Sequence, residues 1–388
     1  MGEPMGLTAS DINFSEATPE QRQLAWELNG SAWAKPMPLD VYVAREAYLS
    51  QQQLCSDRGC QYWVLHLKGY PRQIIASCET TRKTVLISEE GVSREGRGYS
   101  IASVYTNPSY RRRGMAAFLL RRLQEHMDRD SDCSVLYSDV GKTYYAGLGW
   151  RVFPSNQVTL TLLPSPTPSP TSSSPTLASP NDGKQEQQQH PVFTHSQPGR
   201  VRSLELEELR ELCEIDEFHV TARFDKILAD GKRHVAFLPS YPQISWQLAR
   251  SGFMGRKLFE KAPKHKGAVT DNGRSWIYWD HDWREKKLKV LRIVQVLFKT
   301  EEERIDDIKV LLESALAEAN AWGLPKVLLW NPDEVMTRGC KAAGNAHPED
   351  VKIVFDERAD TSIPSLRWAG GKDTHNTVWE DNFYYCWC

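Results

Sequence analysis

The stretch 99–150 constrains the fold of this chain most, because a strand there turns sharply into a helix. Residues 98–105 are apolar and β-branched, which predicts a strand. Asn107-Pro108 ends the pattern, since proline cannot donate a ladder hydrogen bond. A helix is expected to open within residues 111–116. Its apolar face is formed by Met115, Phe118, Leu119, Leu123 and Met127.

The start of this helix is a candidate anion site. The first backbone N–H groups of a helix have no partner within it, and the helix dipole adds positive charge there. Gly114 lets a ligand approach the backbone closely, and the small Ala116 keeps the next turn open. Three arginines, residues 111–113, add charge for phosphate. The pattern predicts capture of a pyrophosphate, and the alternative is a basic helix start that binds no ligand.

The spacing at this turn differs from a Walker loop and from a Gly-x-Gly-x-x-Gly turn. Arg111-x-x-Gly114-x-Ala116 instead resembles the acetyl-CoA signature of the GNAT superfamily of N-acetyltransferases, Gln/Arg-x-x-Gly-x-Gly/Ala. Residues 143–150, which read Thr-Tyr-Tyr-Ala-Gly-Leu-Gly-Trp, resemble the second signature of that superfamily. The resemblance implies an α/β fold of the α+β type, with a mixed, mostly antiparallel sheet flanked by helices. It also implies acetyl-CoA as cosubstrate.

The same resemblance assigns cofactor contacts. In the superfamily, backbone amides of the strand before the turn pair with the pantetheine arm, and amides at the helix start bind the pyrophosphate. By matching position, the implied cofactor-binding residues are Ser103, Val104, Tyr105, Arg111, Arg112, Arg113, Gly114, Met115 and Ala116.

Acetyl transfer also needs a proton removed from the amine and a proton given to the leaving thiolate. The second signature implies Tyr145 as general acid near the sulfur, and the adjacent Tyr144 is the alternative. No Glu or Asp lies in the strand before the turn, so the usual position of the base is unfilled. Glu79 and Asp139 on flanking strands are candidates for binding or deprotonating the amine. A chain of waters could also carry the proton.

Several shorter segments point to one group within this superfamily. Residues 75–83, 102–106, 137–141 and the aromatic C-terminal residues 382–388 resemble the fungal lysine N6-acetyltransferases of lysine catabolism, which also carry a second domain of this length. The implied substrate is the ε-amine of free L-lysine. Alternatives are another small-molecule amine, such as a polyamine or a secondary metabolite, and a non-catalytic module that binds acetyl-CoA.

Length and charge limit the remaining function classes. A chain of 388 residues favours two domains. A net charge of −2 favours neither nucleic acid nor a membrane surface as partner, and no apolar run reaches the length of a membrane span. The eight cysteines are scattered without zinc spacing. We therefore expect reduced thiols, no metal site and a cytoplasmic location.

Changes in composition predict the domain boundaries. Residues 1–163 form the expected acetyltransferase domain, with early strands at 73–79 and 85–87. Residues 164–200 are rich in Pro, Ser and Gln and are expected to be a disordered linker. Residues 201–388 form the expected second, GNAT-like domain.

The second domain is expected to close the amine side of the site. Its strand–helix–strand order over residues 288–330 repeats that of the first domain, but residues 299–303 are mostly acidic where the first domain has arginines. We therefore expect no phosphate site there. The side chains expected to help close that side are Trp276, Tyr278, Trp279, Asp280 and those of the aromatic C-terminal residues 382–388.

Overall fold

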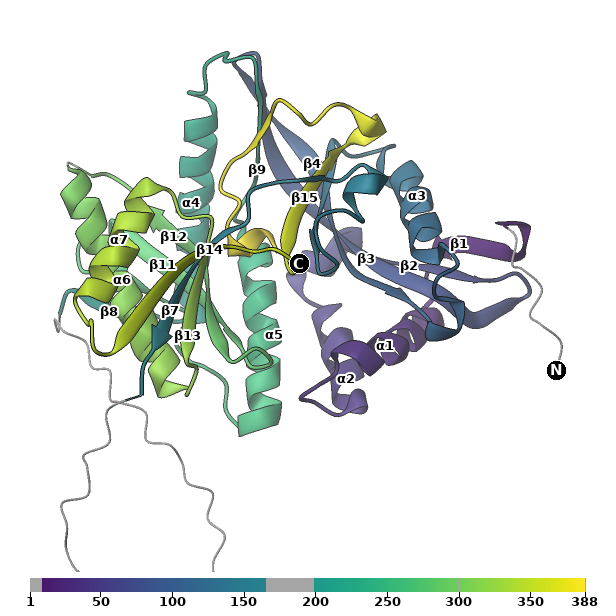
Figure 1. Ribbon diagram of the computed structural model, residues 1–388, viewed down its shortest axis with the longest axis horizontal. Coiled ribbons are helices and arrows are strands. Elements are labelled where there is room, and N and C mark those ends of the chain that lie inside the picture. Colours follow the sequence, from purple (N-terminus) through teal and green to yellow (C-terminus); the bar gives the residue numbers. More distant parts are fainter. Residues whose placement is uncertain (1–8, 165–198, 299, 388) are drawn as a thin grey trace, which may run out of the picture.

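The computed structural model describes residues 9–164, 199–298 and 300–387, which form two lobes, each built on a mixed β-sheet with helices on its faces (Figure 1). The predicted mixed, mostly antiparallel architecture is confirmed. The predicted linker, residues 164–200, lies almost wholly outside the described residues. Among the helices in the described ranges, none has the length and apolar character needed to cross a bilayer.

The first sheet has the strand order β1-β2-β3-β4-β5-β15-β6, and β9 pairs with both β3 and β16. Adjacent strands in this order are antiparallel, except that β4 and β5 are parallel. The strands are β1 (Ile12–Glu16), β2 (Cys60–Leu67), β3 (Tyr70–Glu89), β4 (Val92–Thr106), β5 (Cys133–Ser138), β6 (Arg151–Val152), β9 (Arg233–Phe237), β15 (Ile363–Trp368) and β16 (Thr377–Trp379).

The second sheet has the order β14-β7-β13-β12-β11-β10-β8, and its one parallel pair among the described strands is β12 with β13. Its strands are β7 (Asn156–Leu162), β8 (Val201–Leu204), β10 (Gly267–Thr270), β11 (Ser275–Asp282), β12 (Lys287–Gln295), β13 (Lys326–Trp330) and β14 (Val351–Glu357). Each sheet therefore contains a parallel pair joined by a helical crossover, and β9 with β16 is a further parallel pair in the first sheet.

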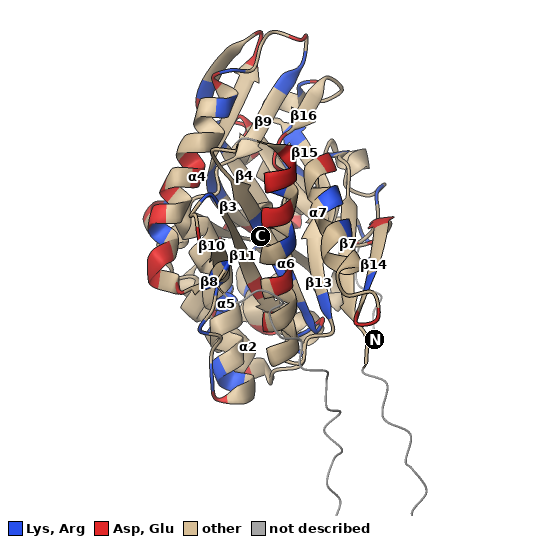
Figure 2. Cartoon of the chain, turned by 90° about the vertical axis from the view of Figure 1, so that its left-hand side faces the viewer, with Lys and Arg blue, Asp and Glu red and all other residues tan. Residues whose placement is uncertain are grey.

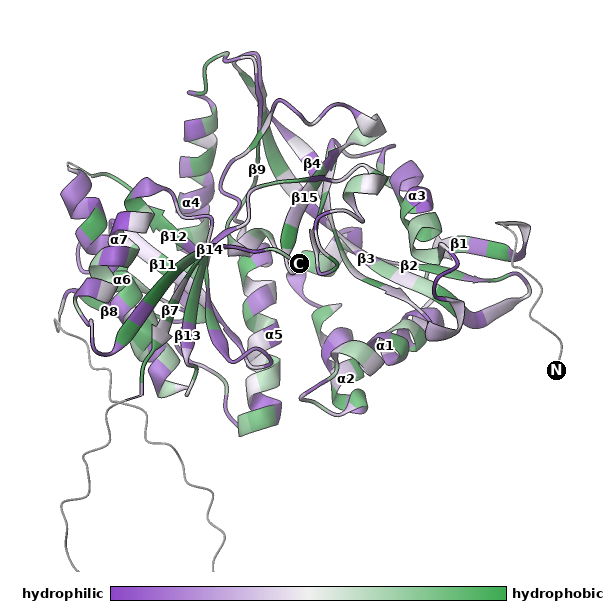
Figure 3. Ribbon diagram, viewed as in Figure 1, coloured by the Kyte–Doolittle hydropathy of each residue, from purple (hydrophilic) through white to green (hydrophobic). Residues whose placement is uncertain are grey.

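The helices cover the faces of these sheets. They are α1 (Pro19–Trp33), α2 (Leu39–Leu49), α3 (Met115–Met127), α4 (Leu209–Phe224), α5 (Tyr241–Phe259), α6 (Glu301–Ala321) and α7 (Glu334–Asn345). Helix α3 is the crossover between β4 and β5, and α6 is the crossover between β12 and β13. Helices such as α4 and α5 alternate hydrophobic and hydrophilic positions (Figure 3), as amphipathic helices on a core do. In the view of Figure 2, acidic and basic residues are interspersed over the surface.

The two halves of the chain exchange strands. β7 follows the first half in sequence but pairs with β13 and β14 in the second sheet. In return, β15 from the end of the chain lies between β5 and β6 in the first sheet (Figure 1). The main hydrophobic cluster accordingly mixes buried residues of both halves, such as Val135 and Phe153 with Ile277 and Leu311.

The C-terminal segment is held between the two sheets by specific contacts. Tyr384 stacks on Trp330 with ring centroids 3.6 Å apart. The Lys83 ammonium on β3 donates to the Cys386 carbonyl at 2.7 Å, and the Gln247 amide on α5 donates to the Tyr385 carbonyl at 2.9 Å. These contacts tie β3, β13 and α5 to one another.

One expectation about the cysteines is wrong. Cys55 and Cys60 form a disulfide, with Cα atoms 4.4 Å apart, where reduced thiols were expected throughout. The chain reverses between α2 and β2 through Asp57 and Arg58, both with positive φ, and this turn brings the two cysteines together. The other cysteines of the described residues are free and buried.

We expect the exchanged strand β15 to be needed for stability. Leu366 on β15 is fully buried, pairs with Val135 and lies in the shared core. Leu366→Ala should lower the free energy of unfolding by about 3 kcal/mol, because it leaves a cavity in a packed core. Urea unfolding measures this. Val354→Ala on β14, whose side chain is 38% exposed, is the control and should change stability by less than about 1 kcal/mol. Equal effects of the two variants would contradict the expectation.

Candidate active site

The two parallel strands β4 and β5 separate at the centre of the first sheet. Their pairing runs from Gly98–Cys133 to Ile101–Leu136 and ends there, although β4 continues to Thr106. Ser103 has a φ of +52°, and the register of β4 against β3 shifts between Ser77 and Glu79. The edge of β4 over residues 103–105 is therefore not paired with β5. Backbone groups along that edge are available to an extended ligand.

Helix α3 begins beside the end of this edge. Gly114 caps it with a φ of +75°, and no atom lies within 4 Å of the position that a Cβ would occupy there. Arg112 also has positive φ, and residues 111–114 are all exposed. The Arg111 side chain turns back, and its Nε donates to the Thr106 carbonyl at 3.1 Å. The helix start is thus an open, basic turn at which N–H groups of the first turn face outward.

Glu79 lies on β3 opposite Ala102 and lines a cavity of about 200 Å³ at the separated strands. Burial, with a further contribution from the negative charge of Glu46, raises the pKa of the Glu79 carboxyl to about 8. A hydrogen bond from Ser103 and the charge of Arg45 act in the opposite direction. A carboxyl with this pKa can take up and release a proton near neutral pH.

Of the other two predicted catalytic residues, Asp139 lines this cavity and Tyr145 is not among its lining residues. Asp139 follows β5, lines the same cavity and accepts a hydrogen bond from the Ser362 backbone at 2.9 Å. Tyr145 precedes the short helix η4 (Ala146–Leu148) and packs edge-on against Trp150. Burial raises the pKa of the Tyr145 phenol, with smaller contributions from Tyr144, Cys78 and Asp139. The Tyr145 phenol therefore remains protonated at neutral pH.

Several side chains in this cavity were not predicted from the sequence. They come from α1, α2, β5, α5 and the turn after β11. The set consists of Trp33, Tyr42, Arg45, Glu46, Leu49, Tyr137, Trp246, Arg250 and Arg284. Trp387, one of the aromatic C-terminal residues expected to help close the amine side, also lines the cavity. Both lobes thus contribute walls. The expected contributors Trp276, Tyr278, Trp279 and Asp280 do not line it, because each is at most 2% exposed within the second lobe.

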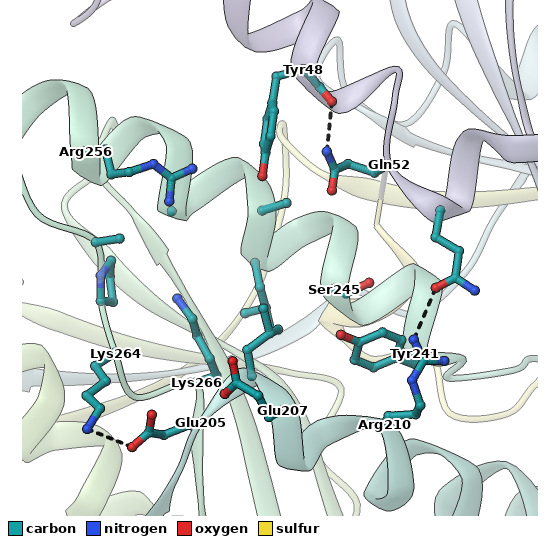
Figure 4. A pocket seen from close by; sticks show the side chains of 17 residues that line it. Tyr48, Gln52, Glu205, Glu207, Arg210, Tyr241, Ser245, Arg256, Lys264 and Lys266 are labelled. Atoms are coloured by element: carbon teal, nitrogen blue, oxygen red, sulfur yellow. Dashed lines mark hydrogen bonds and ion pairs between the residues drawn. The ribbon is translucent and has the colours of Figure 1, made fainter.

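A larger cavity, about 470 Å³, lies elsewhere along α2 and α5 (Figure 4). Its lining includes Tyr48, Tyr241, Arg256 and Lys266, and Lys264 is paired with Glu205 at 2.8 Å. None of the predicted site residues lines it. The smaller cavity is therefore the candidate active site, since it alone of the two adjoins the open edge of β4.

The equivalent turn in the second sheet has a different charge. Helix α6 follows β12 as α3 follows β4, but its first turn consists of Glu301, Glu302 and Glu303, and Figure 2 shows further acidic positions along α6. Negative charge at this position disfavours a phosphate. Within the described ranges, no group of three or more His, Cys, Asp or Glu residues is placed to hold a metal ion.

Comparison with known proteins agrees with this geometry. Residues 22–147 match the acetyltransferase (GNAT) family, and residues 183–388 match the LYC1 GNAT-like C-terminal domain. A "Lysine acetyltransferase" of Yarrowia lipolytica is 22% identical over 78% of this chain and 79% of its own length. The uncharacterized protein YGR111W of Saccharomyces cerevisiae is 22% identical over 95% of this chain and 96% of its own length.

Solved structures share the fold. A conserved protein of unknown function from Enterococcus faecalis V583 superposes with a TM-score of 0.52 at 11% identity, covering 92% of this chain and 72% of that protein. At this identity the likeness concerns the arrangement of sheets and helices alone.

The raised pKa of Glu79 gives a test of the site. In the unfolded chain the Glu79 carboxyl loses its proton near its ordinary pKa of 4.5, whereas in the folded protein it keeps the proton up to about pH 8. The free energy of unfolding should therefore fall as pH rises from about 4.5 to about 8. Glu46→Gln removes a neighbouring negative charge and should lower the pKa of Glu79, measured by NMR titration of labelled glutamates. Glu90→Gln, in the exposed turn after β3, is the control. An unchanged pKa in Glu46→Gln would show that Glu46 does not act on Glu79.

Proposed function

Because the chain belongs to the GNAT acetyltransferases and contains a LYC1 GNAT-like C-terminal domain, we propose that it transfers the acetyl group of acetyl-CoA to the ε-amine of free L-lysine. One observation carries the proposal: the open edge of β4 adjoins a small cavity that contains the carboxyl groups of Glu79 and Asp139. The Yarrowia relative named as a lysine acetyltransferase supports the choice of substrate.

Acetyl-CoA would lie along the open edge and across the start of α3. Backbone groups of Ser103, Val104 and Tyr105 would hold the pantetheine arm. The amides of residues 112–116 and the charges of residues 111–113 would hold the pyrophosphate. The positive φ of Gly114 and the free space around it suit a close approach of phosphate oxygens to the backbone.

The chemistry then requires two proton transfers. The neutral amine attacks the thioester carbonyl carbon, so that a C–N bond forms and the C–S bond breaks. Glu79, with its pKa near the working pH, would accept the proton that the amine loses. Tyr145, which stays protonated, would give a proton to the leaving thiolate. Asp139 would help to bind the amine.

The physiological setting is also a proposal. We propose a cytoplasmic enzyme of lysine catabolism, in which residues 1–163 supply the acetyltransferase site and residues 201–388 close its amine side. The buried free thiols support a reducing compartment, whereas the Cys55–Cys60 disulfide is more typical of an oxidising one.

The reaction product tests the proposal directly. Incubation with acetyl-CoA and pooled free amino acids, followed by mass spectrometry, should yield Nε-acetyl-lysine. The value of kcat/KM should rise with pH through about 8, as Glu79 loses its proton, and Glu79→Gln should remove that inflection. The remaining rise should reflect the lysine amine, with a pKa of about 10.4. Acetylation of a different amine would show that lysine is not the substrate. The absence of any acetylated product would favour a non-catalytic module that binds acetyl-CoA.

Replacement of the two adjacent tyrosines tests the general acid. Tyr145→Phe should lower kcat by about 100-fold, because the phenol acts on the leaving thiolate, and should leave acetyl-CoA affinity within about 2-fold. Tyr144→Phe is the matched control, since Tyr144 is adjacent and 39% exposed. Steady-state kinetics and calorimetry measure the two quantities. If Tyr144→Phe alone lowers kcat, the role belongs to Tyr144.

A further inference from the structure

Charged groups of opposite sign enter the candidate cavity from its two sides. The carboxyl groups of Glu79 and Asp139 come from the first sheet, and the guanidinium groups of Arg250 and Arg284 come from the second half of the chain. The buried Tyr42 lines the same cavity; burial raises the pKa of its phenol, and among the smaller influences Glu79 raises it and Arg250 lowers it. The cavity is thus lined by carboxyl groups from the first sheet and by two guanidinium groups from the second half of the chain.

The other charged groups in the cavity or acting on Arg250 are already paired. The Arg45 Nε donates to the Glu46 carboxylate at 2.8 Å. The Asp280 and Asp282 carboxylates, whose charges favour the protonated form of Arg250, form ion pairs with Lys289 at 2.9 and 3.9 Å. These pairs leave Arg250 without a carboxylate of its own.

Arg250 itself has few contacts for a half-buried guanidinium. Its Cζ lies 5.7 Å from the centroid of the Trp387 ring, and no carboxylate of the described residues lies within 4.0 Å of it. The neighbouring charge of Arg45 adds further repulsion. A guanidinium held away from bulk water gains most from a carboxylate that binds it through two parallel hydrogen bonds.

Arg284 is the weaker of the two candidates for such a partner. Its Nε lies 3.7 Å from the Glu285 carboxylate, and 44% of its side chain is exposed. Solvent and Glu285 already compensate its charge. Arg250 is therefore the residue to which a carboxylate in the cavity would bind most strongly.

We propose that Arg250 binds the carboxylate of the acetyl acceptor, which makes the acceptor a free amino acid with a remote amine and not a simple amine. This inference rests on the proposed function, because it assumes that the acceptor occupies this cavity. The ammonium end then lies at Glu79 and Asp139, beside the open edge of β4. The separation of the two charged walls selects for the length of the amino acid.

Substrates with and without a carboxylate test this role. L-Lysine and 1,5-diaminopentane share the same amine chain, and only lysine carries the carboxylate. Wild-type protein should prefer lysine by about 10- to 100-fold in kcat/KM, as expected for a charge-assisted hydrogen-bonded pair. Arg250→Met should lose that preference through a higher KM for lysine and should leave diaminopentane within about 2-fold. Arg250→Lys should restore part of the preference.

Arg256→Met is the matched control. Arg256 lies on the same helix but is exposed and lines the larger cavity (Figure 4). It should keep the wild-type preference. An equal loss on both substrates in Arg250→Met, or no loss on lysine, would overturn the inference.

Binding measured without turnover separates this inference from the proposed function. Calorimetry with L-lysine should show binding that weakens by about 10-fold or more in Arg250→Met. Binding that depends on Arg250, in a protein that forms no acetylated product, would support the carboxylate site and contradict the proposed reaction. Acetylation of lysine with affinity independent of Arg250 would do the reverse.

Discussion

The exchange of β7 and β15 is the constraint on which the rest of the structure depends. Each sheet receives a strand from the other half at the position next to its parallel pair. The hydrogen bonds of these strands, together with the shared hydrophobic cluster, hold the lobes in one arrangement. Helices α2 and α5 are thereby held in contact, and the walls of the candidate cavity keep their places. A site built from two halves needs this rigidity, because small displacements of reacting groups lower rates strongly.

The cavity combines two groups whose burial is unfavourable. Glu79 is kept partly out of water beside Glu46, and Arg250 is kept partly out of water beside Arg45. Such arrangements destabilise a folded protein unless a ligand or a function compensates for them. In the buried ion pairs elsewhere, such as Arg292 with Asp216, each charge has its partner at 2.6 Å. The contrast marks the cavity as the place where a charged ligand would be stabilising.

The local parts of the site were predictable from sequence. β4, the basic turn and α3 follow from consecutive residues, and the need for positive φ at Gly114 is visible in the motif itself. The long strand β3 is less predictable, because the polar residues 80–83 separate the two predicted strands, 73–79 and 85–87, that it joins. In the structure Thr80 and Lys83 are buried. Thr80 accepts a hydrogen bond from the Trp63 indole N–H at 2.9 Å, and Lys83 donates to the Cys386 carbonyl of the C-terminal segment.

The tertiary parts of the site could not be predicted in this way. Arg45 and Glu46 occupy one helix of the first half, and Arg250 occupies a helix of the second. Helical periodicity indicates that such residues share a face but not which partner that face will meet. Likewise, nothing local to residues 363–368 shows that this strand pairs with β5 instead of with a neighbour in its own half.

The exchange of strands also affects how the protein can form. Ser138 on β5 pairs with Ile363, so more than two hundred residues must leave the ribosome after β5 before its neighbour exists. At ribosomal rates this takes on the order of 10 to 45 s, far longer than a sheet needs to collapse. During that interval the edge of β5 is an unpaired strand edge of the kind that recruits other chains. Association through this edge therefore competes with folding until β15 is made, and contacts of high sequence separation make the last step slow.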